Sequence, residues 1–139
     1  FRCAASFAGV TDINLMYDIS WSDLSEDHKR YGMPTLIGDQ RKDEVLLAAA
    51  SPLKRVAELK IPLLLAHGGE DRRVPIEHAK RFLGAARDAG VAIEYQEYAS
   101  EGHWFFIPSN QADYYKRLEN FLEKSLQPGR GVAGPKRPE

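Results

Sequence analysis

Two continuous runs of apolar residues predict strands that are buried on both faces of a sheet. One covers residues 3–9 (CAASFAG), and the other covers residues 61–68 (IPLLLAHG), where Pro62 is tolerated near the start of the strand. Residues 91–98 (VAIEYQEY) alternate less regularly between apolar and polar positions, which is typical of a strand nearer the edge of a sheet. The hydrophobic pattern therefore predicts three strands.

Apolar positions at helical spacing predict two amphipathic helices. Residues 75–90 begin with a proline in the first turn and end at Gly90, so both ends of this helix carry a stop signal. Residues 110–126 predict a final helix. We expect its buried face to contain Tyr115, Leu118, Phe121 and Leu122.

The segment between the first two strands has a less regular pattern. Residues 13–40 mix aromatic and charged positions with helix-breaking glycine and proline, so we predict loops and short helices there. Residues 42–51 (KDEVLLAAAS) predict a helix, because its first turn contains acidic side chains, which the helix dipole favours there. Residues 51–59 predict a further short helical turn that begins at Pro52.

This order of elements predicts an α/β fold. Strands that alternate with amphipathic helices form a parallel sheet with helices packed on both of its faces. The chain has 139 residues, of which 43% are hydrophobic, which is enough for one core, and we assign residues 1–126 to a single domain. Residues 127–139 are rich in glycine and proline, so we predict a disordered tail.

Charge and hydropathy argue against two classes of partner. The net charge is −1 and the isoelectric point is about 6.5, with both signs mixed along the chain, which gives no footprint for nucleic acid or an anionic membrane. The apolar runs are far shorter than the roughly 20 residues that a membrane-spanning helix needs. The single cysteine, Cys3, has no partner for an internal disulfide, and its apolar surroundings indicate a small buried side chain.

Two polar side chains follow neighbouring strands of the predicted sheet. Asp71 comes shortly after the strand at 61–68, and His103 comes shortly after the strand at 91–98. Because functional groups collect at the carboxyl ends of parallel strands, we expect both residues at the same edge of the sheet. An acid that orients an imidazole, which then takes a proton from a nucleophile, needs this proximity. Glycines beside each residue allow the tight turns involved.

The sequence HGGEDRRVP at 67–75, followed by EGH at 101–103, resembles the acid and histidine motifs of the α/β-hydrolase fold. It is most similar to the prolyl oligopeptidase family of serine peptidases, whose catalytic domain has H-G-x-x-D-x-x-V-P, a helix, a strand and E-G-H. The resemblance covers residues 1–126 and implies the C-terminal part of that fold. It also implies that Asp71 is the triad acid and His103 the triad base, and that no metal or organic cofactor is needed.

The nucleophile expected for this family has no clear counterpart in the chain. The family order is serine, aspartate, histidine, with the serine in a strained G-x-S-x-G turn. Ser6 is the nearest candidate, but Ala4 and Ala8 occupy the two glycine positions, so we favour an ordinary strand residue. Because the chain also begins without an initiator methionine or a signal-peptide pattern, we expect it to be part of a longer protein whose serine lies upstream.

We expect structural or surface positions for the other histidines. His67 ends a strand, where we expect it to bond nearby backbone groups, and we expect His28 and His78 to face solvent. A zinc site built from His67, Asp71, His78 and His103 is a weaker alternative, because no pair of ligands lies at i, i+4 on one helix.

The residues next to His103 in the sequence are expected to pack against or hold its loop. We expect Trp104, Phe105 and Phe106 to pack beneath the loop, with a wall of a substrate pocket as the alternative. Glu101 is expected to hold the loop without taking part in catalysis. Asp71, taken alone, would be a turn or cap residue, and only its pairing with the EGH motif favours the triad role.

These observations make a serine-type peptidase acting on peptide bonds the leading hypothesis. A carboxylesterase with the same triad stays open, as does a non-catalytic interaction module that kept the hydrolase fold. The enzyme readings imply a peptide or a small acyl compound as substrate, and they predict that the isolated chain is inactive because it lacks the nucleophile. We expect its exposed strand edge to favour homo-oligomers. The compartment stays open between cytoplasm and periplasm.

Overall fold

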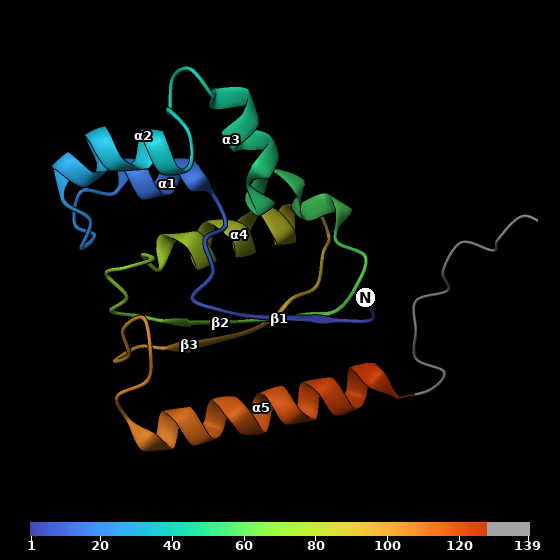
Figure 1. Cartoon of the computed structure of the whole chain (residues 1–139). Coiled ribbons are helices and arrows are strands. Elements are labelled where there is room, and N and C mark those ends of the chain that lie inside the picture. The colour runs from blue at the N-terminus through green and yellow to red at the C-terminus, as the bar shows by residue number, and fades with distance from the viewer. Residues whose placement is uncertain (128–139) are drawn as a thin grey trace, which may run out of the picture.

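The computed structural model describes residues 1–127 and contains a three-stranded parallel sheet (Figure 1). The strands are β1 (Ala4–Phe7), β2 (Leu63–Gly68) and β3 (Glu94–Tyr98). β2 lies in the centre and pairs in parallel with both neighbours. The three predicted strands and their parallel arrangement are therefore confirmed.

Helices cover both faces of this sheet (Figure 1). α4 (Glu77–Asp88) lies on one face, and α5 (Pro108–Leu126) runs along the other. Successive side chains of β2 point to opposite faces, so Leu65 packs with the residues of α4 while Ala66 packs with aromatic residues beside α5. The central strand is buried because each face has its own helical cover.

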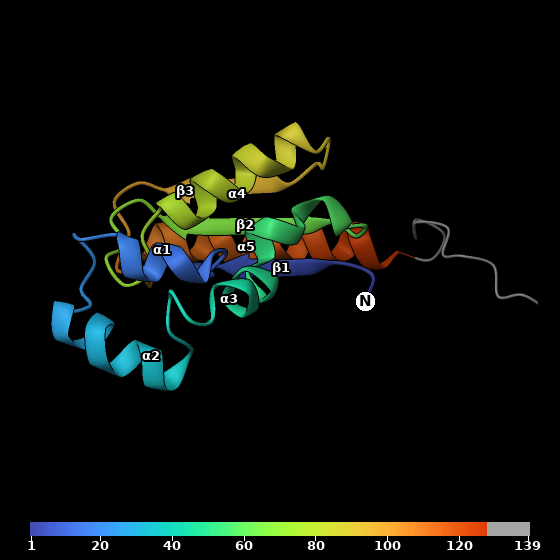
Figure 2. The ribbon, with the colours of Figure 1, turned by 90° about the horizontal axis from the view of Figure 1, so that it is seen from above.

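Short helices fill the connection between β1 and β2, on the α4 side of the sheet (Figure 1). The connection contains α1 (Ile13–Asp18), a π-helical turn (His28–Gly32), α2 (Met33–Leu36), α3 (Glu44–Ala50) and a 3-10 helix (Pro52–Glu58). Seen from above, α2 projects beyond the sheet (Figure 2). The prediction of loops and short helices in this segment is confirmed.

β1 is less buried than the sequence predicted. Ala5 is exposed, because among the described residues β1 pairs only with β2. Cys3, just before β1, is half-buried, whereas the sequence predicted a buried side chain. β3 also pairs on one side only within residues 1–127, which agrees with the edge position predicted for it.

The final helix differs from its prediction in start and in orientation. α5 begins at Pro108, two positions earlier than expected, because proline suits a first helical turn. Its buried residues are Tyr114 and Phe121, whereas Tyr115 is half exposed, so the prediction for Tyr115 was wrong. The directions of adjacent side chains on a helix differ by about 100°, so of these two tyrosines only Tyr114 faces the sheet. Apart from Gln127, the predicted tail lies outside the described residues.

None of the helices within residues 1–127 is both long enough and apolar enough to span a membrane.

Candidate active site

The loop after β2 holds Asp71 in a fixed, fully buried position. Asp71 Oδ1 accepts hydrogen bonds from the backbone N–H groups of Arg73 and Val74, both at 2.9 Å, and the side chain has no solvent exposure. This pattern, in which an aspartate bonds backbone groups two and three residues ahead, closes a tight turn. The turn leaves Asp71 Oδ2 available to other donors.

Two glycines allow this loop to lie directly against the loop after β3. A Cβ atom on Gly68 would stand 2.1 Å from the carbonyl oxygen of Gly102, and one on Gly69 would stand 2.5 Å from that of Ala99. The close contact is held by the N–H of Gly69, which donates to the carbonyl of Tyr98 at 2.9 Å. Glycine is therefore required here by the approach of two backbones.

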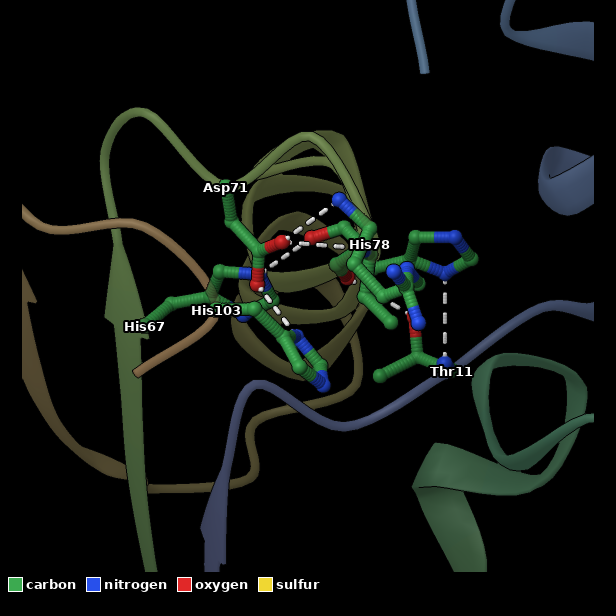
Figure 3. Close-up of polar contacts among 7 residues, drawn as sticks. Thr11, His67, Asp71, His78 and His103 are labelled. Atoms are coloured by element: carbon green, nitrogen blue, oxygen red, sulfur yellow. Dashed lines mark hydrogen bonds and ion pairs between the residues drawn. The ribbon is translucent and has the colours of Figure 1, made fainter. Parts of the chain in front are cut away.

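The same contact brings His103 to Asp71. His103 Nδ1 lies 2.9 Å from Asp71 Oδ2, and Figure 3 shows the imidazole directed at the carboxylate. Because a carboxylate only accepts, Nδ1 carries the proton and Nε2 is the nitrogen left to accept one. The His103 side chain is 49% exposed, while Asp71 is fully buried. The sequence placed both residues at one edge, and the structure brings them into hydrogen-bond contact.

Glu101 anchors the loop that carries His103. Its buried carboxylate accepts hydrogen bonds from the N–H of Phe106 at 2.7 Å, from the N–H of Ile107 at 3.0 Å and from Asn110 Nδ2 at 2.9 Å. Burial by itself would raise the pKa of Glu101, but these three donors hold it below its ordinary value. The expectation that Glu101 holds the loop is confirmed.

Residues 1–129 match the sequence model of the prolyl oligopeptidase family. The chain belongs to the prolyl oligopeptidase family. Dipeptidyl aminopeptidase BIII of Pseudoxanthomonas mexicana is 27% identical over 131 residues, which cover 91% of this chain and 18% of that protein. The mouse protein named inactive dipeptidyl peptidase 10 is 30% identical over 141 residues, covering 100% of this chain and 16% of that protein.

A solved structure also supports the fold. The crystal structure of puromycin hydrolase superposes with a TM-score of 0.79 at 26% identity, covering 96% of this chain and 19% of the other. The architecture is thus the C-terminal part of an α/β-hydrolase fold. Because the chain spans about a fifth of the length of these prolyl oligopeptidase relatives, most of each relative lies outside the match.

Ser6 does not lie in the turn that the prolyl oligopeptidase family uses for its nucleophile. It is a residue of β1, in register with Leu65 of β2, and β1 continues to Phe7. The interpretation of Ser6 as an ordinary strand residue is therefore confirmed. Among residues 1–127, no group of three or more His, Cys, Asp or Glu side chains has the arrangement of a metal site.

His67, near the end of β2, also lies close to Asp71. Its Nε2 atom lies 2.7 Å from the carbonyl oxygen of Val74 and 3.5 Å from Asp71 Oδ2. The side chain is completely buried. The backbone contact was expected from the sequence, whereas the approach to Asp71 was missed, because no sequence pattern records which side of a turn an imidazole faces.

His78 is buried, so the prediction of a solvent-facing side chain was wrong. It lies in the first turn of α4, and its Nδ1 accepts the N–H of Thr11 at 3.3 Å, while the Thr11 hydroxyl donates to the His78 carbonyl at 2.7 Å. Burial is the main cause that lowers the pKa of His78 to about 4, and the nearby His67 contributes to this lowering. This neutral imidazole connects α4 to the loop after β1.

An aromatic cluster supports the loop of His103 from below. Phe105 packs against Phe7 and Tyr114, with ring centroids 4.7 and 5.4 Å apart. Trp104 meets Phe7 edge-on but stays half exposed, and Phe106 is 81% exposed. The packing predicted for these three residues is confirmed for Phe105 and wrong for Phe106, which points away from the cluster.

An apolar groove opens beside the loop after β1. It has a volume of about 310 Å³, and its lining is almost entirely hydrophobic. The lining residues are Val10, Ile13, Met16, Leu24, His28, Met33, Leu36 and Ile37. The segment that forms it is tied to the loop of Asp71, because the N–H of Asp23 donates to the Arg72 carbonyl and Arg73 Nε pairs with Asp23 Oδ2, both at 2.7 Å.

Proposed function

We propose that the complete protein containing this chain is a serine-type peptidase, with Asp71 and His103 as two members of its catalytic triad. The observation that carries the proposal is the 2.9 Å contact between the buried Asp71 carboxylate and the half-exposed His103 imidazole. Membership of the prolyl oligopeptidase family and a relative named as a dipeptidyl aminopeptidase support it. The nucleophile is proposed to be a serine upstream of Phe1.

The proposed reaction is acyl transfer to that serine. His103 Nε2 removes the hydroxyl proton as the serine oxygen attacks the peptide carbonyl, and the imidazolium then returns this proton to the leaving amine. Asp71 keeps Nδ1 protonated and stabilises the positive charge that develops on the ring. Water repeats the sequence on the acyl-enzyme and releases the acid. The oxyanion donors belong to parts of the protein outside this chain.

The apolar groove favours a substrate with a hydrophobic side chain. Its lining offers little polar surface, so a charged side chain would lose hydration there without gaining a partner. We propose peptides with an apolar residue near the scissile bond as the substrate class. Esters of the same acyl group serve as the comparison, because a carboxylesterase would use the same triad.

One relative favours a second candidate function, a non-catalytic interaction module. The mouse relative that aligns with the whole chain is named as inactive. Under this hypothesis the fold and the Asp71–His103 pair persist without a nucleophile. The candidate predicts that the residue at the nucleophile position of the complete protein is not serine.

Peptide hydrolysis by the complete protein tests the first proposal. Peptidyl anilides with apolar side chains should be hydrolysed, and Asp71→Asn should lower kcat on the order of 10⁴-fold because the imidazole loses its fixed tautomer. Asp88→Asn is the matched control, since Asp88 is exposed at the end of α4. Turnover of esters with no turnover of anilides would favour the esterase, and turnover of neither by folded protein would favour the interaction module.

A further inference from the structure

A second, fully buried imidazole reaches the carboxylate of Asp71. Figure 3 shows His67 and His103 approaching this side chain, whereas His78 turns toward Thr11. His103 Nδ1 lies 2.9 Å from Asp71 Oδ2, and His67 Nε2 lies 3.5 Å from the same oxygen. One oxygen therefore faces two ring nitrogens, only one of which belongs to the proposed triad.

The contact to Val74 fixes the protonation of His67. The carbonyl oxygen of Val74, 2.7 Å from His67 Nε2, can only accept, so Nε2 carries a proton. The other nitrogen, Nδ1, is buried and has no hydrogen-bond partner among the described protein atoms. A proton on Nδ1 would therefore be an unsatisfied buried donor, which is costly. The favoured form is the neutral ring with its hydrogen on Nε2.

This hydrogen has two neighbours that belong to one turn. Val74 accepts it directly, while Asp71 Oδ2 lies within range of the same positive N–H dipole. The opposite carboxylate oxygen, Oδ1, accepts from the backbone of Arg73 and Val74. His67 thus links both ends of the Asp71–Val74 turn to β2, the most deeply buried strand of the sheet. Losing its N–H would free the turn and would also remove a positive dipole from Asp71.

We propose that His67 is a positioning residue, a role that rests on the proposed function. It holds Asp71 against His103 and partly neutralises the negative charge that Asp71 presents to His103. The charged and titratable groups around it are Asp71 on the loop after β2, His78 on α4 and His103 on the loop after β3. His67 touches neither substrate nor nucleophile in this role. It acts only through Asp71.

Two substitutions of His67 in the complete protein test this role. His67→Leu keeps a similar volume and removes the donor, so kcat should fall by roughly 10-fold or more as Asp71 loses its fixed position. The acid limb of the pH dependence of kcat/KM should move to higher pH, by about 0.5 to 1 unit, because the less neutralised carboxylate favours the imidazolium of His103. His67→Gln places an amide N–H near the position of Nε2 and should restore most of both properties.

His78→Leu is the matched control for loss of a buried imidazole. It removes a contact to Thr11 and not to Asp71, so it should lower stability while the acid limb stays in place. A His67→Leu protein with an unmoved acid limb and unchanged kcat would overturn the proposal. Equal losses in the Leu and Gln variants would also overturn it, because they would show that the N–H donor is irrelevant.

A measurement on the wild-type protein covers the case in which His67→Leu does not fold. Nitrogen-15 spectra of the histidines should show His67 as the neutral ring protonated at Nε2 at pH 7, and the opposite tautomer would overturn the proposal. Failure of the proposed function is distinguishable, since wild-type protein would then show no hydrolysis that depends on His103, whereas failure of this inference leaves an active wild type.

Discussion

Backbone atoms of the loop after β3 limit which residues can occupy the loop after β2, close to Asp71. The carbonyl oxygens of Glu101 and Gly102 lie where a side chain on Gly68 would begin. The position of Asp71 relative to His103 depends on that contact, because the loops carrying them meet there. The glycine pair at 68–69 is thus part of the site's geometry although neither residue carries a functional group.

Gly68→Ala should destabilise the protein and weaken the Asp71–His103 contact. The new Cβ would stand 2.1 Å from a backbone oxygen, so the two loops must separate, at a cost of roughly 2 kcal/mol or more. Gly84→Ala is the matched control: nothing lies within 4 Å of its Cβ in α4, and alanine should stabilise the helix by roughly 0.5–1 kcal/mol. Urea denaturation of both variants measures these free energies of unfolding, and equal stabilities would contradict the prediction.

His78 should make stability fall in mild acid. Its pKa is lowered to about 4 in the folded protein, against 6.5 for the free side chain, so the unfolded chain takes up a proton first as pH falls. The contribution is intact above pH 6.5 and is lost between pH 6.5 and 4, by about 1 to 2 kcal/mol from pH 7 to pH 5. Unfolding free energies at both pH values should fall less in His78→Leu, and equal losses would contradict this.

At the scale of elements, the loop after β3 is organised by the helix that follows it. Glu101 collects donors from Phe106, Ile107 and Asn110, so the loop closes on itself and on the first turn of α5. The aromatic cluster then fixes the underside of the loop. His103 is consequently presented by a short segment held at both ends, which limits its movement relative to Asp71.

Glu101→Gln should loosen this loop. The amide nitrogen of glutamine would face an N–H group, leaving two donors opposed, so Tm and kcat/KM should both decrease. Glu123→Gln removes the same charge from an exposed position of α5 and should change neither. Hydrogen exchange at residues 103–107 would report the loosening directly. Exchange as slow as in the wild type would show that Glu101 does not hold the loop.

The elements and the central pair were predictable because each leaves a local pattern. Apolar runs mark β2, helical spacing marks α4, and Asp71 and His103 each follow a predicted strand, which places them at one edge of a parallel sheet. The burial of His78 was not predictable, because its partner Thr11 lies 67 residues away. Tyr115 was misplaced because neighbouring tyrosines at 114 and 115 give two helical faces with similar apolar content.

At the scale of the whole molecule, the sheet of the described residues has two open sides, and β1 forms one of them. The N–H groups of Ala4 and Ala8 donate toward β2. Because N–H groups alternate in direction along a strand, those of Ala5 and Phe7 point to the open side. Unpaired strand edges favour pairing with other chains. The chain also spans about a fifth of its relatives, so the hydrolase fold described here is a portion of the unit found in them.

The chain of residues 1–139, taken alone, should therefore associate through β1. Its apparent mass in sedimentation should rise with concentration. Ala5→Pro removes an N–H that points to the open side and keeps the bonds of Ala4 and Ala8 to β2, so this variant should associate less. A chain that stays monomeric at all concentrations, or an Ala5→Pro variant that associates equally, would contradict the prediction.

The proposed function depends on one step, in which His103, held by Asp71, activates a serine of the complete protein. Labelling with a fluorophosphonate probe tests it most directly, because this reagent reacts with an activated serine hydroxyl. We expect the folded wild-type protein to be labelled on a serine upstream of Phe1, and we expect His103→Ala to abolish the labelling. An unlabelled wild type, or labelling that persists in folded His103→Ala protein, would contradict it.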